Sequence, residues 1–596
     1  VANVAFTGNG SSVVNAVAFA NDGTLTLGQD GGTQTYNGGL NTTSVGGTVT
    51  LNGTIATSND AIVFGAVTLG SNTIVDTNAT NGTGDITLAA VTGGNNTLTL
   101  TTENNVANAD ITASGAISGV TTLTLASVGG TATLSADVDV TTLSVDNTVA
   151  NVAFTGNGSS VVNAVAFAND GTLTLGVNGG TQTYNGGLNT TSVGGAVGLN
   201  ATINVNGGNL VLGAVNINTT TVLDLNGDNN SLTYTSFNDG TSGGNLTINT
   251  DGGFNLNNSA NIGSGNLSIN IDADNDGVET LFVGISPSAS SISYSGSEAS
   301  NDTLIGPNSN TAWIITAGNT GTLASNTFSN FANLTGGTSN DTFTFTETGS
   351  LTGLLDGGAH DSGDTADYSG LGAQTIDLGG TAGGITRIEN VAGNLNQTLL
   401  GATNNQSWTI NGADDGTVVD QETLVSVAFT NFGNLAGAEG NDTFTFASGG
   451  SVSGLINGGA GTDTVDYDTN NISGVTVTLN GTNTGISNVE NLAGQNTTIA
   501  GGAGNATWDL NANSGGTVND GTTIVTFTNT VAIEGSDNVN VFTANGSYSG
   551  AINLISNDNT WNHTAGAKLT TGAVSGEGAL TIPDVNGGTL YKNTLD

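Results

Sequence analysis

The chain has 596 residues, including 94 glycines and only 8% charged residues, a composition that excludes a helical bundle and is atypical of a disordered chain. Lys and Arg total 3 against 47 Asp and Glu, so the formal net charge is -44. Nucleic acid and anionic membrane surfaces are bound through clustered basic residues, so neither partner is expected. Calcium, a hard cation that prefers oxygen ligands, is the expected counterpart.

The sequence contains no Cys and no Met. Without thiols it has no zinc–thiolate site, no disulfide and no cysteine nucleophile. There is also no apolar run of about 18 residues that would cross a bilayer. We therefore expect a mature or internal segment of a larger secreted protein, located outside the cell and without membrane insertion.

The first part of the chain is dominated by a duplication. Residues 1–28 recur unchanged as residues 149–176, and the similarity extends over residues 1–55 and 149–203. Repeats of this identity indicate stacked structural units. The offset of 148 residues corresponds to about seven coils of 20 to 21 residues, where a coil is one turn of a solenoid.

Between Asp85 and Asn147 the sequence consists of short alternating strands such as NTLTLTT and TTLSVD, separated by Gly, Asn and Asp. Such strands bury their apolar side chains only when they are stacked in register, which predicts an all-β fold. Residues 1–234 resemble the filamentous-haemagglutinin type of bacterial surface adhesin. The resemblance implies a right-handed parallel β-helix, or β-solenoid, that forms an extracellular rod.

A change of composition near Thr235 suggests three regions: a solenoid over residues 1–235, a transitional region over 236–306, and a second solenoid over 307–596. The last region has three repeats of about 100 residues. Each repeat contains one tryptophan, which we interpret as a core residue, with a sugar-stacking role as the alternative. These tryptophans are Trp313, Trp408 and Trp508.

Copies of one module within the last region provide a coil length. They cover residues 333–368 and 434–467, with a degenerate third copy at 534–554. Equivalent glycines lie 21 residues apart, at Gly336 and Gly357 and again at Gly437 and Gly458, and the offset of 101 residues between the first two copies suggests about five coils. A coil of roughly 20 to 21 residues predicts roughly 28 to 30 coils in the whole chain.

The acidic loop, residues 272–277, is the clearest candidate metal site. Its sequence DADNDG places Asp272, Asp274 and Asp276 on alternate positions before a glycine, a spacing that wraps one calcium ion. The carbonyl of Val278 and the carboxylate of Glu279 are further candidate ligands. A solvated acidic loop without an ion is the alternative.

Two Gly-Asp turns form the second candidate. Residues 458–466, GGAGTDTVD, fit the nonapeptide of the repeats-in-toxin calcium β-roll, and residues 437–444 nearly fit it. This resemblance implies calcium ligands at Asp442 and Asp463, and in the earlier copy at Asp341 and Asp364. A plain Gly-Asp turn is the alternative interpretation.

Catalysis has little support, because His360 and His563 are the only histidines and neither belongs to a Ser/His/Asp pattern. Asn-x-Ser/Thr triplets, for example at residues 9–11, 52–54 and 81–83, are formal glycan acceptors that also arise by chance in such a sequence. We expect a non-enzymatic structural or adhesive protein that binds glycans or proteins of host or neighbouring cells, or associates with itself. The alternatives are a calcium-dependent surface-layer or biofilm-matrix protein and, more remotely, a β-helix glycan-processing enzyme or tailspike.

Overall fold

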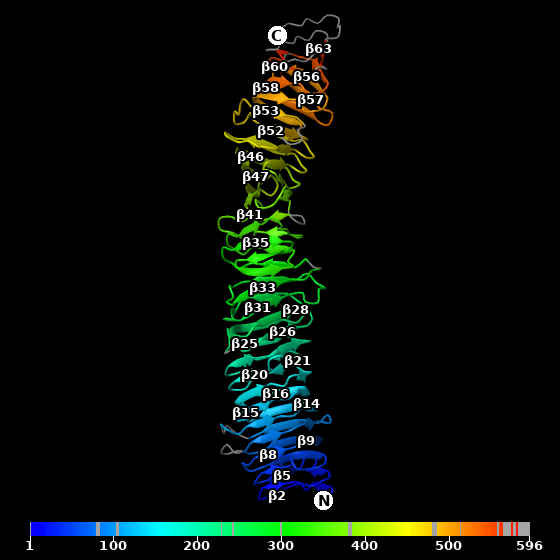
Figure 1. Ribbon diagram of the computed structural model, residues 1–596, viewed down its shortest axis with the longest axis vertical. Helices are drawn as coiled ribbons and strands as arrows, with labels where there is room; N and C mark the ends of the chain where they lie inside the picture. Colours follow the sequence, from blue (N-terminus) through cyan, green and yellow to red (C-terminus); the bar gives the residue numbers. More distant parts are fainter. Residues whose placement is uncertain are drawn as a thin grey trace. The chain divides into compact units, whose positions relative to one another are not determined.

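The computed structural model describes residues 2–78, 84–102, 107–227, 229–240, 243–298, 301–379, 384–479, 485–512, 514–546, 548–556, 559–563, 574–575 and 580–581. All regular elements in these ranges are β-strands, stacked in about 23 turns (Figure 1). The predicted all-β solenoid is thereby confirmed. The triplet at 81–83 and the two lysines, Lys568 and Lys592, lie outside the described residues.

The chain divides into two compact units. Unit 1 contains Val1–Pro307 and Asn326–Phe331, and unit 2 contains Asn308–Ser325 and Ala332–Asp596. Strand β27 (Leu232–Asp239) runs through the change of composition near residue 235 without interruption. Coils of unit 1 therefore continue on both sides of that point.

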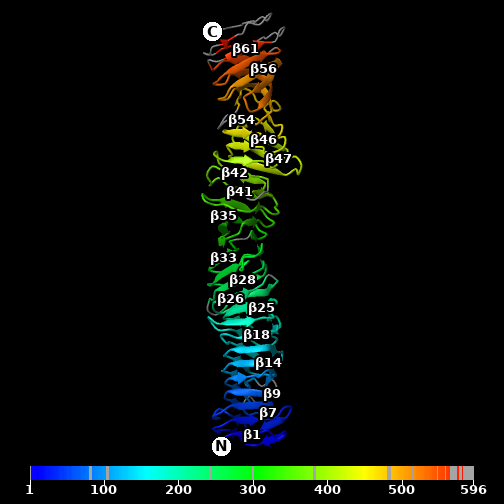
Figure 2. The same cartoon turned by 90° about the vertical axis from the view of Figure 1, so that its right-hand side faces the viewer.

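Most strands of unit 1 belong to two ladders of parallel strands (Figure 2). Stack A consists of β1 (Val4–Phe6), β4 (Leu25–Leu27), β7 (Val49–Ala56), β9 (Val67–Asp76), β11 (Val91–Thr92), β14 (Ile117–Ala126), β16 (Val138–Val145), β18 (Ser160–Val161), β21 (Thr181–Tyr184), β24 (Thr202–Val205), β26 (Thr221–Leu225), β28 (Leu246–Thr250), β31 (Asn266–Asn270), β33 (Ser291–Ser295) and β37 (Asn326–Ser329). Stack B consists of β3 (Val17–Ala18), β6 (Leu40–Asn41), β8 (Ile62–Phe64), β10 (Ile86–Leu88), β13 (Ile111–Ala113), β15 (Thr131–Leu134), β17 (Asn151–Phe154), β20 (Leu173–Leu175), β23 (Val197–Leu199), β25 (Leu210–Ile217), β27 and β30 (Ser259–Asn261). Stack A also contains β2 (Ser11–Val13), β5 (Thr33–Tyr36) and β12 (Leu98–Thr101), and stack B also contains β19 (Val165–Ala166) and β22 (Leu188–Asn189). The remaining strands are β29 (Phe254–Leu256), β32 (Thr280–Val283) and β34 (Thr303–Ile305).

The core follows directly from strand alternation. In β4, Leu25 and Leu27 are fully buried while Thr26 between them faces outward, and the same pattern recurs in β7 and β9. Each buried Leu or Val contributes roughly 1.5 to 3 kcal/mol by leaving water. Because successive coils align these side chains, the core is a continuous apolar column along the stack.

Coil length is less uniform than the sequence suggested. Val4 pairs with Leu25, Leu25 with Val49, and Val49 with Val67, so the second of these coils is longer than the first and the third is shorter. The coil length therefore varies around the predicted 20 to 21 residues, because the corners absorb loops of different length, and the predicted 28 to 30 coils are too many. About 23 turns are formed.

The duplicated segments occupy different faces of unit 1. Strand β1 pairs with β4 in stack A, whereas its duplicate β17 pairs with β15 and β20 in stack B. The duplicate of β2, strand β18, pairs with β16 in stack A. The offset between the two copies is therefore not a whole number of coils but slightly less than seven, close to the about seven that the sequence suggested.

Unit 2 is built on one long ladder, stack C, and two shorter ones. Stack C consists of β35 (Ala312–Ala317), β36 (Thr320–Leu323), β39 (Thr342–Phe345), β41 (Thr365–Asp367), β44 (Asn390–Ala392), β46 (Gln406–Gly412), β47 (Asp415–Asp420), β48 (Ser426–Thr430), β50 (Thr443–Phe446), β52 (Thr464–Asp466), β53 (Thr476–Thr478), β55 (Asn491–Ala500), β56 (Ala506–Ala512), β57 (Gly515–Asn519), β58 (Ile524–Glu534), β59 (Asn540–Ala544), β60 (Ala551–Asn553), β61 (Asn559–His563), β62 (Val574–Ser575) and β63 (Leu580–Thr581). The shorter ladders contain β38 (Asn333–Thr335), β40 (Leu355–Asp356) and β43 (Ile385–Thr386), and β42 (Thr375–Asp377), β45 (Thr398–Leu400), β49 (Asn434–Ala436), β51 (Leu455–Asn457) and β54 (Gly485–Ser487).

Antiparallel meanders interrupt the parallel winding of stack C. Strand β47 pairs antiparallel with both β46 and β48, while β48 pairs parallel with the preceding β44 and β46 with the following β50. Strands β56, β57 and β58 repeat this arrangement. Along the chain, β39 is followed after one turn by β41, after another by β44, after a third by the meander β46–β48, and after a fourth by β50. The first two copies of the module are therefore four turns apart, and the prediction of five is wrong.

The three repeat tryptophans lie on the first strand of each antiparallel pair, and all are fully buried. Their rings stack on phenylalanines of the next parallel strand: Trp313 on Phe343 at 5.3 Å, Trp408 on Phe444 at 5.3 Å, and Trp508 on Phe542 at 5.8 Å between ring centroids. The core interpretation is confirmed. The sugar-stacking alternative is wrong, because none of these three indole faces is exposed.

Candidate functional site

The acidic loop follows β31 in unit 1 and brings three carboxylates together. Oxygen atoms of Asp272, Asp274 and Asp276 all lie within 4.8 Å of one another. Asp272 is 1% exposed and has a positive φ of 50°, and its Oδ1 accepts hydrogen bonds from the backbone N–H groups of Asp276 and Gly277 at 3.1 and 3.3 Å. Its Oδ2 accepts a hydrogen bond from the hydroxyl of Ser297 at 2.6 Å. The buried carboxylate thus fixes the loop, while Asp274 and Asp276 face solvent.

The other two candidate ligands are not part of this group of three. Val278 is 65% exposed, and the backbone N–H of Glu279 donates to Asp302 Oδ1 at 2.8 Å. The carboxylate of Glu279 lies beside Gly277, where an added Cβ would come within 3.1 Å of Oε1. Three converging carboxylates are a suitable beginning of a calcium site, whose ion usually takes six to eight oxygen ligands. Calcium binding at this loop stays a prediction.

The two Gly-Asp turns of the second module lie one coil apart, as the spacing of their glycines predicted. Thr443 pairs with Thr464, and a bridge joins Glu439 to Ala460. In the earlier module Leu334 pairs with Leu355, so the equivalent glycines again share one edge. The glycine edge is confirmed.

In this second module the predicted ligands form a buried carboxylate ladder. Asp442 Oδ1 accepts a hydrogen bond from the backbone N–H of Gln406 at 2.6 Å, and the N–H of Asp442 donates to Asp463 Oδ1 at 2.8 Å. The N–H of Asp463 in turn donates to Glu490 Oε2 at 2.8 Å. Each carboxylate therefore caps an amide of the coil before it, and both aspartates are fully buried.

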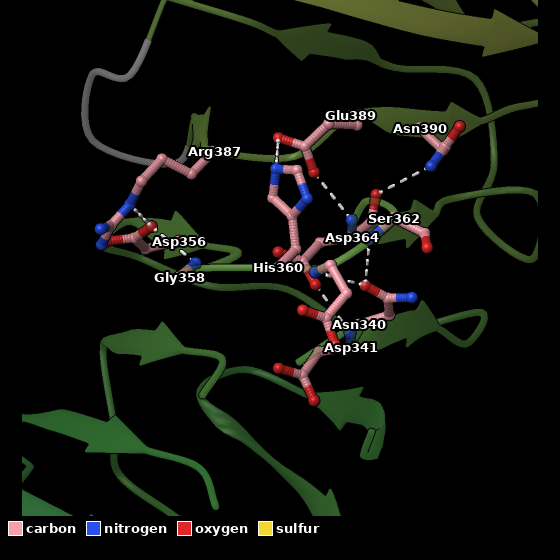
Figure 3. Close-up of polar contacts among 11 residues, drawn as sticks. Asn340, Asp341, Asp356, Gly358, His360, Ser362, Asp364, Arg387, Glu389 and Asn390 are labelled. Carbon is pink, nitrogen blue, oxygen red and sulfur yellow. Dashed lines mark hydrogen bonds and ion pairs between the residues drawn. The ribbon is translucent and has the colours of Figure 1, made fainter. Parts of the chain in front are cut away.

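The first module has the same ladder (Figure 3). Asp341 accepts hydrogen bonds from the N–H groups of Thr311 and Gly337 at 2.9 and 2.8 Å. The N–H of Asp341 donates to Asp364 Oδ1, and that of Asp364 donates to Glu389 Oε2, both at 2.7 Å. The ladder is thus repeated within unit 2. Its two glutamates, Glu389 and Glu490, were not predicted from the sequence.

Three aspartates of these ladders have a second carboxylate oxygen without a hydrogen-bond partner. Oδ2 of Asp364, Asp442 and Asp463 is buried and has no hydrogen-bond partner. Burial raises the pKa of Asp442 to about 7 and that of Asp341 to about 6, in each case with a smaller contribution from the aspartate of the next coil. Burial likewise raises the pKa of Asp364 and of Asp463.

Glycine is required beside the unpartnered oxygens. A Cβ added to Gly458 would lie 2.0 Å from the carbonyl oxygen of Asn488 and 2.5 Å from Asp463 Oδ2, and one added to Gly437 would lie 2.1 Å from Asp442 Oδ2. Buried carboxylate oxygens beside backbone carbonyls suit either a bound proton or a cation. Calcium at Asp341, Asp364, Asp442 and Asp463 stays a prediction.

Among the described residues, the first ladder alone has basic side chains near it (Figure 3). His360 Nε2 lies 2.9 Å from Glu389 Oε1, and Arg387 donates through Nε to Asp356 Oδ1 at 2.6 Å and through Nη2 to Oδ2 of the same carboxylate. The inserted residues around His360 are accommodated because Asn340 Oδ1 accepts hydrogen bonds from two successive N–H groups. The second module has Asn488 at the position of Arg387.

A cleft of about 400 Å³ lies beside this cluster and is lined by two carboxylates, those of Glu389 and Asp420. Both carboxylates are engaged in structural contacts. Glu389 contacts His360 and the N–H of Asp364, as described above. Burial acts to raise the pKa of Asp420, but hydrogen bonds from Thr423, Asn404 and the N–H of Glu422 outweigh it and lower that pKa. A glycosidase needs one protonated carboxylic acid and one free carboxylate, and Glu389 and Asp420, both held in structural contacts, are unsuited to these roles.

The degenerate third module replaces the aspartates of the ladder by asparagines. Asn540 Oδ1 accepts a hydrogen bond from the N–H of Ser536 at 2.7 Å, and its Nδ2 donates to Asn559 Oδ1 at 3.0 Å. Trp508 Nε1 also contacts Asn540 Oδ1 at 3.4 Å. The third module therefore forms this corner with uncharged side chains at both aspartate positions of the ladder.

Comparison with known proteins adds no relative: no family model, no curated protein and no solved structure matches the chain. Within the described ranges there is no helix with the length and apolarity needed to cross a membrane. The family-level conclusion is therefore limited to the fold, a β-solenoid repeat protein.

Proposed function

We propose that this chain is a non-enzymatic structural or adhesive protein of the bacterial cell surface, where its coils form part of an extracellular fibre. The observation that carries the proposal is the linkage between coils. Backbone ladders join successive coils in both units, and asparagine side chains add further bonds between coils, as when Asn434 Oδ1 accepts from the N–H of Leu455 at 2.9 Å. Adding a copy of such a unit lengthens the stack without altering its chemistry.

The same linkage supports a mechanical role. Pulling a coil away from its neighbour breaks a set of backbone hydrogen bonds and exposes several buried Leu, Val or Ile side chains to water. Calcium at the acidic loop would stiffen it by neutralising the mutual repulsion of Asp272, Asp274 and Asp276. The partners we propose are glycans or proteins on host or neighbouring cells, or further copies of this protein.

Adhesion is tested with beads that carry the full-length protein, passed over glycan-coated and cell-coated surfaces under flow with calcium or with chelator. Retention that exceeds retention of beads carrying an unrelated acidic protein of similar charge supports the proposal. Equal detachment on every surface would refute the adhesive role.

Lateral assembly, as in a surface layer, is the second candidate, and the meander loops favour it. Leu424 is 73% exposed and Val425 51% exposed on the loop between β47 and β48, and Ile524, the first residue of β58 in the second meander, is 58% exposed. Exposed apolar residues that repeat along one unit are typical of contact sites. Electron micrographs of the protein and of a Leu424→Asp, Ile524→Asp double variant test this: sheets or bundles should form only without the substitutions.

A further inference from the structure

Two half-enclosed cavities of unit 2 are lined by equivalent residues of the first two modules. The first lies between the coil of Phe345 and that of Tyr368 and has a volume of about 100 Å³. The second lies between the coil of Phe446 and that of Tyr467 and has a volume of about 240 Å³. In each, the tyrosine ring stacks on the phenylalanine ring, with centroids 4.4 and 4.3 Å apart. The cavity is therefore a repeated feature of the coil pair and not one irregular loop.

The tyrosine hydroxyl groups at these cavities have no hydrogen-bond partner among the described residues, although Tyr368 is only 6% exposed and Tyr467 7% exposed. Every other tyrosine that the structure describes has a partner: Tyr36 contacts Gln34, Tyr184 contacts Gln182, Tyr234 contacts Asn258, Tyr294 contacts Asn326, and Tyr548 contacts Thr530. A hydroxyl group that is largely buried without a partner is unfavourable. A polar group that enters the cavity would supply the missing partner.

The lining of both cavities is uncharged. Among the described residues that form it there is no Asp, Glu, Lys or Arg, although the chain has 47 carboxylates. Each cavity has two further hydroxyl groups besides that of its tyrosine, on exposed side chains: Ser350 and Thr375 in the first, Ser451 and Thr476 in the second. Apolar walls with three hydroxyl groups, which both donate and accept hydrogen bonds, suit a small neutral ligand that carries CH groups and hydroxyl groups of its own.

We propose that each of these two cavities binds one neutral sugar ring, with the hydroxyl group of Tyr368 or Tyr467 as the buried polar contact. The inference rests on the proposed function, since it assigns the glycan partner named there to a place in unit 2. An acidic sugar is disfavoured, because the net charge of the chain is -44 and no cationic side chain lines either cavity among the described residues. The second cavity is the larger and has Val475 at the position of Gln374, so it is the stronger site.

The third module shows how such a cavity can be filled by the chain itself. Strands β51 and β60 correspond, and counting back three residues from each places Tyr548 at the position of Val452. Tyr548 is fully buried, and its hydroxyl oxygen lies 3.3 Å from Thr530 Oγ1. A tyrosine is thus accommodated at this position of the coil. Leu351→Tyr and Val452→Tyr, at equivalent positions of the first two modules, are therefore suitable substitutions for blocking both cavities.

The test measures sugar binding to the full-length protein in solution by saturation-transfer NMR. The probes are the methyl glycosides of glucose, galactose and mannose, with glucuronic acid as the anionic counterpart. At least one neutral glycoside should bind, and glucuronic acid should bind at least about tenfold more weakly than that glycoside.

Substitutions then locate the bound sugar. The combined change Tyr368→Phe and Tyr467→Phe removes the two hydroxyl groups alone and should raise the dissociation constant roughly three- to tenfold, with Tyr467→Phe causing most of the increase. The combined change Leu351→Tyr and Val452→Tyr should abolish binding. The matched control Tyr36→Phe removes a hydroxyl group in unit 1 that is hydrogen-bonded to Gln34, and it should leave the dissociation constant unchanged. Should the blocking pair fail to fold, as shown by its unfolding midpoint, the pair of phenylalanine substitutions decides.

Three results would overturn the inference: no neutral glycoside binds, glucuronic acid binds as tightly as the neutral glycosides, or the pair of phenylalanine substitutions leaves the dissociation constant unchanged. These measurements are separate from the adhesion assay under flow. Beads that are retained on cell-coated surfaces although the protein binds no glycoside in solution would refute the cavities as sugar sites and leave the adhesive role standing. Glycoside binding that the phenylalanine substitutions weaken, without retention of the beads, would support the sites and refute adhesion.

Discussion

Replacing Asp442 by Asn should stabilise unit 2 at neutral and alkaline pH. Asp442 is fully buried, uses Oδ1 to cap the amide of Gln406, and leaves Oδ2 without a partner. An asparagine keeps the capping oxygen and removes the charge. The third module shows that an asparagine is accommodated at this position, although Asn540 caps the amide of Ser536 in its own turn rather than an amide of the preceding coil, and donates to Asn559.

The size of the effect follows from the pKa. Asp442 has a pKa of about 7 when folded, against an ordinary value of 3.8. A difference of about three units corresponds to roughly 4 kcal/mol, an upper bound because coil movement and water entry would reduce it. Since the folded pKa is raised, the neutral carboxyl favours folding fully below about pH 4, and this contribution is lost as pH rises toward 7.

The assay is chemical unfolding of the full-length protein in chelator at pH 4, 6 and 8, followed by the fluorescence of the buried tryptophans. Asp442→Asn should raise the unfolding midpoint at pH 8 and have little effect at pH 4. The reciprocal variant Asn540→Asp should lower the midpoint at pH 8 and leave it nearly unchanged at pH 4. Equal effects of Asp442→Asn at both pH values would refute the reasoning.

Three further predictions concern the acidic loop, the glycine edge and the ion pair beside the first ladder. Calcium should raise the unfolding midpoint of the parent protein, and the combined change Asp274→Asn and Asp276→Asn should reduce that shift while the exposed control Asp170→Asn keeps it in full; a shift that the double change leaves undiminished contradicts the loop as a calcium site. Gly458→Ala should lower stability by roughly 1 to 3 kcal/mol because its Cβ meets the carbonyl of Asn488, whereas Gly372→Ala, with no atom within 4 Å of its Cβ, should be close to neutral in the same unfolding experiment. Arg387→Ala should cost less than about 1 kcal/mol, since the arginine side chain is 57% exposed, and a larger loss would show that the ion pair with Asp356 holds the corner together.

Strand alternation and glycine spacing were enough to predict the solenoid. Thr443, Phe444, Thr445 and Phe446 have the pattern of a strand with one inward face, and the structure places both phenylalanines in the core. The regular spacing of the glycines correctly placed the two Gly-Asp turns on one edge. These signals are local, so a single sequence carries them in full.

The meanders and the variation in coil length could not be predicted in the same way. An antiparallel strand such as β47 has the same alternation as a parallel one, so its pairing depends on contacts with β46 and β48 rather than on its own residues. Corner loops add or remove residues without changing the buried positions, and this is why longer and shorter coils pack in one stack.

Burial of the ladder carboxylates had a sequence signal that we did not use. Asp442, Phe444 and Phe446 alternate along the chain, so the aspartate lies on the inward side of its strand, and Asp463 stands in the same relation to Val465. The participation of Glu389 and Glu490 was missed because each lies a full coil beyond the aspartate whose amide it caps. Only the coil register brings these groups together.

The most direct test of the proposed mechanical role is stretching of single full-length molecules held at both ends. If successive coils share the load, the force trace should show repeated peaks whose spacing corresponds to the release of one or a few coils, roughly 8 nm for a coil of about 24 residues. Extension at low force without peaks would contradict the account, because it would mean that the ladders between coils do not resist pulling.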